Sequence, residues 1–344
     1  MTLYLTHGAK KNVGDFLIHD RARKLWSHLA PEVKVVSVKR WEPFEFPDDA
    51  RSVVLCGGPG FTPRMVEGVF PLVKNAREQG LPISGLALGW QGLPARNPGS
   101  FAMTARSVST LRAIADSGAP LSVRDDVTQE IAQQYGIETV RTGCSVWYSI
   151  PHLGMGPNVV TDPRTVVYTT PAKAENEAES IAVMKVLRQR FPRAKLIASF
   201  HRGIEKDEMT PADQAKPLKR QARAAKKLGF EVRDTAYDLG KIGFYEETDL
   251  HVGYRVHAHL DFVSRRVPSL LISEDGRGFG QTATLHGPKS VLWAGSKDLP
   301  IKVDRRLEQE TKAGWPSLQR AIDTIEEHYP VMQEVIARQA ALSV

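Results

Sequence analysis

The residues best suited to chemistry lie between positions 249 and 281, a stretch that contains three histidines and several arginines and carboxylates. Residues 250–252 have the pattern of a buried strand, and apolar residues at helical spacing follow from 256 to 263. Arg255 and His257 therefore lie at a strand-to-helix junction. In an open parallel sheet such junctions lie at the carboxyl edge, where ligands bind, and a helix start attracts anions. We expect a phosphate or a carboxylate to bind there.

A second apolar strand, residues 269–272, delivers Glu274, Asp275 and Arg277 to the same predicted edge. Independent segments thus bring Arg255, His257 and Arg277 together, and we interpret these three as functional.

Three other polar residues of this stretch have a simpler interpretation. His259 is typical of a partly buried helix residue, and Arg265 and Arg266 of a solvated helix face. We therefore predict structural roles for all three.

The beginning of the chain has the form of a ligand-binding turn. A strand over residues 2–6 leads into a loop with Gly8 and Gly14, and a helix is predicted over 16–29. A dinucleotide GxGxxG pattern is absent. Asp15 would lie at the N-cap of this helix, where capping or a functional role explains it equally well.

Polar or glycine-rich segments follow three further predicted strands. Gly57 and Gly58 follow residues 52–55, where they serve either a tight turn or the approach of a ligand. Trp90 and Gln91 lie in a loop after the strand at 83–87, and Trp90 either contacts a sugar ring or packs. Arg124 lies between the strand 121–123 and a helix at 127–135, which repeats the geometry of Arg255.

Strands alternate with helices in both halves of the chain, which favours two α/β domains with parallel sheets covered on both faces. We predict two Rossmann-like domains over residues 1–160 and 164–300, the glycosyltransferase-B-like architecture, with the active site in the cleft between them. Residues 301–344 are predicted to be a helical segment that packs back on the first domain, with its last helix pair, 315–341, interrupted at Pro330.

The run GYRVHAHLDFVSRRVPSLLISEDGRGFG resembles the signature of the polysaccharide pyruvyl transferase family, in which an Arg-x-His opens a helix and a basic residue follows about twenty positions later. Three stretches fit the same family in order: NVGD from residue 12, GGPG from residue 57 and VRD from residue 123. The resemblance covers most of the chain from residue 5 to 290.

The resemblance implies transfer of pyruvate from phosphoenolpyruvate to two sugar hydroxyls, which forms a ketal on a polysaccharide or its lipid-linked precursor. Arg124, Arg255 and Arg277 would bind the anionic donor, because a guanidinium binds phosphate and carboxylate with paired N–H groups. His257 would donate the proton and Asp15 would accept one. The implied acceptor-binding residues are Asn12, Gly14, Gly57, Gly58, Trp90 and Gln91. No cofactor and no metal are expected.

Two positions depart from the family pattern. Arg277 stands where a lysine is common in the family, which keeps the cation and changes its reach, and Gly57-Gly58-Pro59-Gly60 stands where four glycines are common. Asp125 and Glu274 remain alternatives to Asp15 as the base.

The 344-residue chain is 42% hydrophobic and 25% charged, with a net charge of +7, a mix typical of a globular protein. Its two cysteines exclude a disulfide scaffold, and no apolar run approaches the length of a membrane span. The basic segment 216–227 lacks aromatic residues for base stacking, which argues against nucleic acid. It is typical of a solvated helix, or of a surface attracted to an anionic membrane. We expect a cytoplasmic enzyme, with peripheral contact at the inner face of the membrane as one alternative.

Two rival functions remain open. A sugar-nucleotide glycosyltransferase of the same architecture would need an acidic residue to hold a ribose, and Glu274 or Asp275 could serve. A non-catalytic carbohydrate-binding relative would keep the fold without the chemistry.

Overall fold

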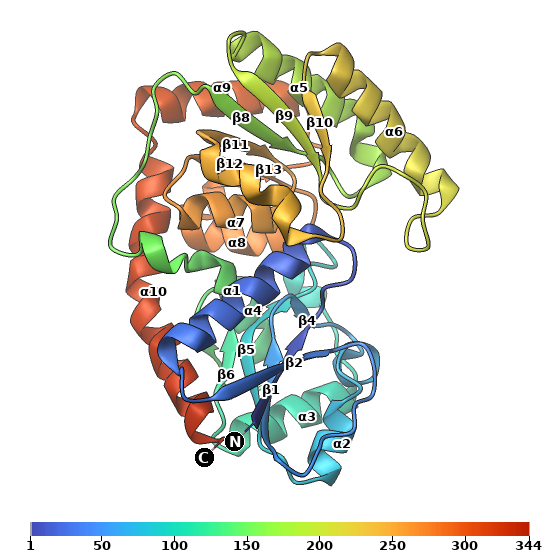
Figure 1. The fold of residues 1–344 in the computed structure, drawn as a ribbon, viewed down its shortest axis with the longest axis vertical. Coiled ribbons are helices and arrows are strands. Elements are labelled where there is room, and N and C mark those ends of the chain that lie inside the picture. The colour runs from blue at the N-terminus through green and yellow to red at the C-terminus, as the bar shows by residue number, and fades with distance from the viewer. Residues whose placement is uncertain (1, 344) are drawn as a thin grey trace.

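The computed structural model describes residues 2–343 and consists of two α/β domains, stacked along the long axis of the molecule (Figure 1). Each domain has one sheet whose neighbouring strands are all parallel within the described residues. The two-domain α/β architecture predicted from the alternation of strands and helices is confirmed.

The N-terminal sheet has the strand order β2-β1-β3-β5-β6-β7, with β4 paired to β5. Its strands β1 and β5 are buried along nearly their whole length, as expected for strands that helices cover on both faces. The strands are β1 (Thr2–His7), β2 (Lys34–Lys39), β3 (Ala50–Cys56), β4 (Pro59–Phe61), β5 (Ile83–Trp90), β6 (Leu121–Val123) and β7 (Val140–Arg141). The helices are α1 (Val13–Leu29), α2 (Val73–Glu78), α3 (Ala105–Asp116) and α4 (Asp126–Gln134).

The C-terminal sheet has the order β10-β9-β8-β11-β12-β13. Counted within the domain this is 3-2-1-4-5-6, the order of doubly wound dinucleotide-binding sheets. The strands are β8 (Thr165–Thr169), β9 (Lys195–Phe200), β10 (Glu231–Asp234), β11 (Leu250–Gly253), β12 (Ser269–Ser273) and β13 (Leu292–Trp293). The helices are α5 (Glu177–Arg190), α6 (Ala212–Lys227), α7 (Val256–Ser264) and α8 (Gly276–His286).

The C-terminal segment divides between the two domains. Helix α9 (Leu299–Lys312) packs against α5 of the C-terminal domain, whereas α10 (Pro316–Ala341) runs down one side of the molecule to the N-terminal domain (Figure 1). There Gln339 donates to the carbonyl oxygen of Gly85 over 3.1 Å, and the hydroxyls of Ser343 and Ser52 lie 2.6 Å apart. The predicted break at Pro330 is wrong, because α10 continues through it.

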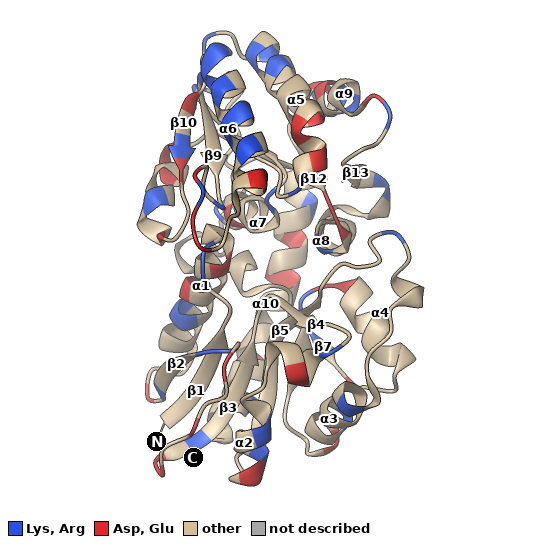
Figure 2. Ribbon diagram, turned by 90° about the vertical axis from the view of Figure 1, so that its right-hand side faces the viewer, with Lys and Arg blue, Asp and Glu red and all other residues tan. Residues whose placement is uncertain are grey.

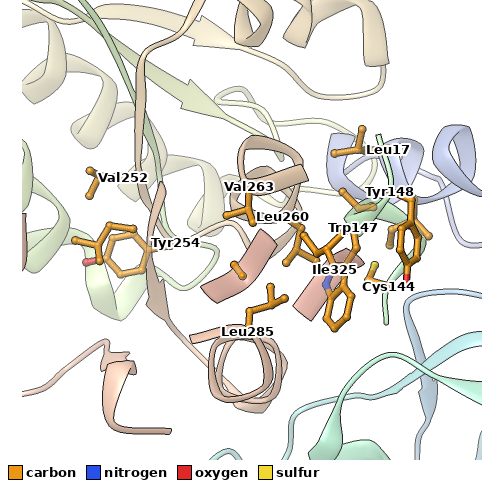
Figure 3. Close-up of a cluster of buried hydrophobic side chains, with 14 of the residues drawn as sticks. Leu17, Cys144, Trp147, Tyr148, Val252, Tyr254, Leu260, Val263, Leu285 and Ile325 are labelled. Carbon is orange, nitrogen blue, oxygen red and sulfur yellow. The ribbon is translucent and has the colours of Figure 1, made fainter. Parts of the chain in front are cut away.

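An apolar core joins the domains. Leu17 of α1, Trp147 of the linker and Leu260 of α7 belong to one buried cluster with Ile325 of α10 (Figure 3). Truncation of such a residue, for example Leu260, to alanine would cost about 3 kcal/mol of stability. The two domains therefore share a packed interior and do not merely touch.

Polar contacts also cross between the domains. Arg21 of α1 donates to Asp261 of α7 over 2.7 Å, and the Trp147 indole donates to Gln281 of α8 over 2.7 Å. The backbone N–H of Val13 donates to the carbonyl oxygen of His201 over 3.2 Å. The contacts of Val13 and Arg21 hold α1 against the C-terminal domain.

Basic residues are concentrated on the exposed face of α6 (Figure 2), where Lys216, Arg220, Arg223, Lys226 and Lys227 are exposed. The neighbouring Glu177 pairs with Arg220. Within residues 2–343, no helix has both the length and the hydropathy needed to cross a membrane.

Candidate functional site

The carboxyl edges of the two sheets meet at the junction between the domains. The winding direction changes between β8 and β11 in the C-terminal sheet and between β1 and β3 in the N-terminal sheet. Ligands of open parallel sheets bind outside such switch points. Loops that follow β1, β8, β11 and β12 line one common cavity there.

Arg255 occupies the N-cap position of α7, directly after β11. Its backbone N–H donates to the hydroxyl of Thr169 over 3.3 Å, and Nη2 donates to the carbonyl oxygen of Pro171 over 3.0 Å. Its Nε is buried without a protein partner. Burial lowers the pKa of Arg255 to about 10, so the group remains charged at pH 7. A buried guanidinium with an unused N–H is well suited to bind an anion.

His257 lies in the first turn of α7 and is 9% exposed. A methyl group on Gly14 would lie 3.1 Å from its Nδ1, so the start of α1 packs directly against the imidazole. Its Nε2 is buried without a protein partner. Burial, together with Arg124 and Arg277, lowers the pKa of His257 to about 3. The imidazole is therefore neutral at pH 7 and has one nitrogen free for a ligand.

Arg277 is held by the residue that caps its own helix. Asp275 is the N-cap of α8 and accepts the backbone N–H of Arg277 over 2.9 Å and its Nη2 over 2.6 Å. Burial acts to raise the pKa of Asp275, but Arg277 and Arg124 outweigh it and lower the pKa. Asp275 is thus ionised and positions Arg277 at the wall of the cavity.

Arg124 lies behind the cavity and is 1% exposed. Its Nη2 donates to the carbonyl oxygen of Trp90 over 2.7 Å, and its Nε donates to Asp125 over 3.2 Å. Its Nη1 is buried without a protein partner. From this position the charge of Arg124 lowers the pKa values of His257 and Asp275. Arg124 was predicted to contact the donor directly, but it does not line either of the cavities that Arg255 lines.

Asn12 and Asp15 approach from the N-terminal domain. Helix α1 begins at Val13 with Asn12 at its N-cap, so the predicted N-cap position of Asp15 is wrong and capping does not explain this residue. The Asn12 amide donates to Asp15 over 3.2 Å. Burial raises the pKa of Asp15, although Arg40 and Arg277 oppose the rise. A carboxylate of raised pKa next to cations is suited to accept a proton.

Two cavities meet at Arg255. The smaller, of about 40 Å³, is narrow and is lined from both domains. Its polar walls are formed by Asn12, His201, Arg255, His257, Glu274, Asp275 and Arg277. The larger, of about 340 Å³, shares Ala172 and Arg255 with it. Lys173, Arg202 and Arg255 line the larger cavity, with no carboxylate among the described lining residues.

Gly57 and Gly58 line a third cavity of about 10 Å³ beside Asp15 and Arg40. The φ angles of the two glycines are +52° and +67°, so the turn itself requires them. Arg40 donates to the carbonyl oxygen of Gly57 over 2.8 Å. The structure places these glycines at the back of Asp15 and not against the larger cavities.

Trp90 is not available to a sugar. It is 1% exposed, and its indole N–H donates to the carbonyl oxygen of Leu93 over 3.1 Å. Gly276 packs against its ring, and Phe101 lies edge-on to it. The prediction of an acceptor contact for Trp90 is therefore wrong, because β5 continues through Trp90 and buries it. Gln91 is partly buried, and its backbone N–H bonds to Phe61.

The two other candidate bases are already engaged. Glu274 accepts the backbone N–H groups of Ala172 and Lys173 over 2.7 and 3.0 Å. Asp125 caps α4 by accepting the N–H of Thr128 over 2.8 Å. Both carboxylates hold backbone in place, which leaves Asp15 as the candidate base among the three.

The histidine and the arginines predicted to be structural are bound within the protein. His259 contacts the Ser269 hydroxyl over 2.7 Å, and Arg265 donates to the carbonyl oxygen of Tyr245 over 2.6 Å. Arg266 pairs with Glu326 of α10. The arginines differ from the prediction in one respect, because both are buried and neither lies on a solvated face.

Three residues at the site were not predicted from the sequence. Arg40, at the end of β2, acts to lower the pKa of Asp15. His201 and Arg202 follow β9, and His201 lines the cavity of about 40 Å³ while Arg202 lines the one of about 340 Å³. His201 bonds to the hydroxyl of Tyr245 over 2.6 Å, and its Nδ1 is buried without a protein partner. All three follow a strand of a parallel sheet, and this position in the sequence could have identified them as candidates for the site.

The comparison with known families is decisive for the assignment. A model of the polysaccharide pyruvyl transferase family matches residues 12–276, well over half of the chain. The chain belongs to the polysaccharide pyruvyl transferase family. The matched range includes Asn12, Asp15, Arg255 and His257, and Arg277 lies one residue beyond it. A search of curated proteins found no match.

Solved structures show the fold of this family member. It is similar to the UDP-GlcNAc 2-epimerase of Neisseria meningitidis bound to UDP-GlcNAc (TM-score 0.58, 10% identity, 98% of this chain and 100% of that chain covered). It is also similar to the UDP-N-acetylglucosamine 2-epimerase of Rickettsia bellii (TM-score 0.57, 11% identity, 98% and 95% covered). A third is S. aureus MnaA in a co-structure with UDP (TM-score 0.55, 12% identity, 97% and 94% covered). The glycosyltransferase-B-like architecture predicted from the sequence is therefore confirmed.

No metal site is evident from side-chain grouping. Within residues 2–343, no three histidine, cysteine or carboxylate side chains gather as a metal centre would require.

Proposed function

We propose that this transferase moves the pyruvyl group of phosphoenolpyruvate onto two hydroxyls of a sugar, forming a ketal and releasing phosphate. The observation that carries the proposal is a set of three unpartnered nitrogens, Nε of Arg255, Nε2 of His257 and Nδ1 of His201, in residues that line one cavity between the domains of a pyruvyl transferase family member. Buried polar nitrogens normally have partners, so several unpartnered ones around one cavity, together with the charge of Arg255, favour a bound anion.

The charges around the site suit the donor. Phosphoenolpyruvate carries a phosphate and a carboxylate, and Arg255 and Arg277 offer fork-shaped cations on one wall. Lys173 and Arg202 add positive charge in the adjoining cavity. Arg124 acts on the site through its charge. The cavity at His257 is narrow, about 40 Å³, so we expect the side chains around it to move when the donor binds.

His257 is the proposed proton donor. Its pKa of about 3 in the empty site would rise beside a phosphate dianion, because an opposite charge favours the imidazolium. The proton passes to C3 of the enol, which becomes a methyl group and leaves C2 electrophilic. A sugar hydroxyl then attacks C2 and loses its proton to Asp15.

The second half of the reaction expels phosphate. The bond between C2 and the bridging oxygen breaks, the phosphate leaves with the electron pair, and Arg255 and Arg277 stabilise its charge. The second sugar hydroxyl attacks C2, gives its proton to His257, which had passed its own to C3, and closes the ring. No cofactor is required, because phosphoenolpyruvate itself carries the activated pyruvyl group.

The acceptor is proposed to be a glycan or a lipid-linked sugar that enters from the side of the N-terminal domain. Asn12 and Gly14 line the cavity there, opposite His257. Gly14 permits the close approach of α1 to the imidazole, since a side chain at this position would press on His257.

A sugar-nucleotide glycosyltransferase remains the rival proposal, supported by the cavity of about 340 Å³ at the switch point of the C-terminal sheet. The carboxylates that could hold a ribose argue against it. Glu274 is bonded to the loop after β8, and Asp275 is bonded to Arg277. A non-catalytic carbohydrate-binding relative would not need the buried cations.

A ligand-stabilisation experiment separates these proposals. We expect phosphoenolpyruvate at 100 times its Kd to stabilise the protein by about 2.7 kcal/mol, and UDP-sugars to have no effect. The stabilisation should disappear in Arg255→Ala and persist in His28→Ala, which changes an exposed histidine far from the cavity. Stabilisation by a UDP-sugar alone would support the glycosyltransferase, and stabilisation by a glycan alone the binding protein.

The basic face of α6 supports a further proposal, peripheral contact with an anionic membrane that holds the acceptor. Five exposed cations lie on this helix, one of them, Arg220, paired with Glu177, and each unpaired cation near such a surface would contribute about 1 kcal/mol. Co-sedimentation with vesicles tests this. We expect binding to vesicles with anionic lipids, loss of binding in Arg223→Glu/Lys227→Glu, and none to neutral vesicles.

A further inference from the structure

A line of buried side chains crosses the C-terminal domain and ends at the donor site. At its far end, Nδ1 of His286 lies 2.9 Å from the carbonyl oxygen of Ser317, at the start of α10. Nε2 of His286 lies 3.0 Å from Nε2 of His259. Nδ1 of His259 lies 2.7 Å from the hydroxyl of Ser269 in β12.

The line continues through the sheet to α7. The same Ser269 hydroxyl lies 2.7 Å from Nδ1 of His251 in β11. Nε2 of His251 lies 2.9 Å from the hydroxyl of Thr169 in β8, which accepts the backbone N–H of Arg255 over 3.3 Å. Strand pairing places these groups side by side, since His251 pairs with Ser269 and Gly253 with Thr169. We call these contacts the histidine chain.

The carbonyl end determines the proton positions in the first half of the chain. The Ser317 oxygen only accepts, so Nδ1 of His286 carries a proton. A neutral imidazole has one N–H, so Nε2 of His286 accepts, and Nε2 of His259 must donate to it. Nδ1 of His259 is then an acceptor, and the Ser269 hydroxyl donates to it.

The other half follows in the same direction. The Ser269 oxygen accepts from Nδ1 of His251, which leaves Nε2 of His251 as an acceptor for the Thr169 hydroxyl. The Thr169 oxygen accepts from the N–H of Arg255, which can only donate. The Arg255 N–H is compatible with this direction, because the Thr169 oxygen accepts it while the hydroxyl proton goes to His251, so every contact of the chain has one donor and one acceptor.

The assignment requires three neutral histidines, and burial provides this. It lowers the pKa of His251 to about 3 and that of His286 to about 4, and it holds the pKa of His259 well below its usual value. A neutral chain has a single direction, because the terminal carbonyl can only accept and each imidazole and hydroxyl has one proton to donate.

We propose that the histidine chain positions the donor site: it fixes the Thr169 hydroxyl as the acceptor for Arg255, and thereby the backbone that presents Arg255 and His257 to the cavity. Thr169, His251, Ser269, His259 and His286 are positioning residues. The proposal rests on the proposed function in one respect, that the ligand so positioned is phosphoenolpyruvate.

Nitrogen NMR of the histidine side chains tests the chain without any ligand. We expect alternating tautomers in the wild-type protein, with the proton on Nδ1 in His286 and His251 and on Nε2 in His259. The same tautomer in all three, or a charged ring at pH 7, would overturn the proposal.

Thr169→Val tests the positioning, because it keeps the shape of the side chain and removes the hydroxyl. We expect the Arg255 amide to lose protection from hydrogen exchange, and the Kd for phosphoenolpyruvate to rise about tenfold, since small displacements of binding groups have effects of this size or more. Thr169→Ser should restore both properties.

Ser264→Ala is the matched control, because it removes a buried hydroxyl of α7 that donates to the carbonyl oxygen of Asp261 outside the chain. It should leave the Arg255 amide and the Kd unchanged. Equal Kd values for Thr169→Val and wild type would disprove the positioning role. If the wild type does not bind phosphoenolpyruvate, the proposed function fails. The tautomers and the exchange of the Arg255 amide would still test the histidine chain by themselves.

Discussion

Arg124 and Arg255 each follow a short buried strand of a parallel sheet and precede a helix, one in each domain. At the start of α4, Arg124 is enclosed, because α8 of the other domain lies against it and Gln281 donates to its carbonyl oxygen over 3.1 Å. At the start of α7, Arg255 borders two cavities. The comparison shows that the same local design yields a structural residue or a ligand-binding residue according to what packs opposite.

The two junctions also differ in how the start of the helix is capped. Asp125 directly follows Arg124 and caps α4 with its carboxylate. Arg255 is itself at the N-cap of α7, where no side chain caps the helix, and His257 of the first turn has an unpartnered nitrogen. The α4 junction is therefore enclosed, although Nη1 of Arg124 lacks a partner, whereas the α7 junction borders two cavities and is left with groups for a ligand.

The largest expected effect is at His257. His257→Ala should reduce the rate of pyruvyl transfer by about 10²- to 10⁴-fold, the usual contribution of a general acid. Steady-state measurement of phosphate release from phosphoenolpyruvate in the presence of acceptor checks this, with His28→Ala as the exposed control. A rate within twofold of wild type would show that another group supplies the proton.

The next largest effect is on the free energy of unfolding, which should depend more on Arg124 than on Arg255. Arg124→Met should lower the free energy of unfolding by about 3 kcal/mol, because it leaves buried Asp125 without its cation. Denaturant titration measures this loss. A loss of less than 1 kcal/mol would mean that the enclosed arginine contributes little to the fold.

Acid should destabilise the protein in part through His257 at the α7 junction. The pKa of His257 is about 3 in the folded protein and about 6.5 when unfolded, so only the unfolded chain binds a proton between these values and stability falls as the pH falls through this window. His257→Gln removes this contribution. The variant should therefore gain about 1.4 kcal/mol relative to wild type for each pH unit from 6 down to 4, as measured by urea unfolding. Parallel pH profiles for the two proteins would contradict the lowered pKa.

Arg255→Met should show the opposite balance to Arg124→Met. We expect the Kd for phosphoenolpyruvate to rise at least tenfold, or about 1.4 kcal/mol, with a smaller change in stability, because its guanidinium lacks a carboxylate partner in the described structure. Calorimetric titration measures the Kd. If Arg124→Met weakens binding more than Arg255→Met, the division between the two junctions is wrong.

The smallest expected effect is at Gly14. Gly14→Ala would place a methyl group 3.1 Å from Nδ1 of His257, so we expect a severalfold loss of rate with little change in stability. Gly156→Ala is the control, since a methyl group there meets no atom within 4 Å. Equal rates for the two variants would show that the approach of α1 does not constrain the imidazole.

Much of the α7 junction was predictable because its determinants are local. The apolar strand, the Arg-x-His pair and the helical spacing after it lie within fifteen residues, and they placed Arg255 and His257 correctly at a sheet edge. Trp90 was mispredicted because the length of β5 depends on its pairing with β3, β4 and β6, which local sequence does not encode. Arg40 and His201 were missed because each reaches the site only through the order of strands in its sheet.

The sequence by itself determined the alternation of strands and helices, the two-domain architecture and the family of the protein. The tertiary structure decided which arginine is enclosed and which is free, because the partners of a buried guanidinium come from segments far apart in the chain: α8 covers Arg124 from more than 150 positions away. It also decided the proton arrangement of the histidine chain. The ends of that chain are a carbonyl oxygen in α10 and the N–H of Arg255 before α7. The hydrogen bonds that connect them form only when six elements, far apart in the sequence, pack together.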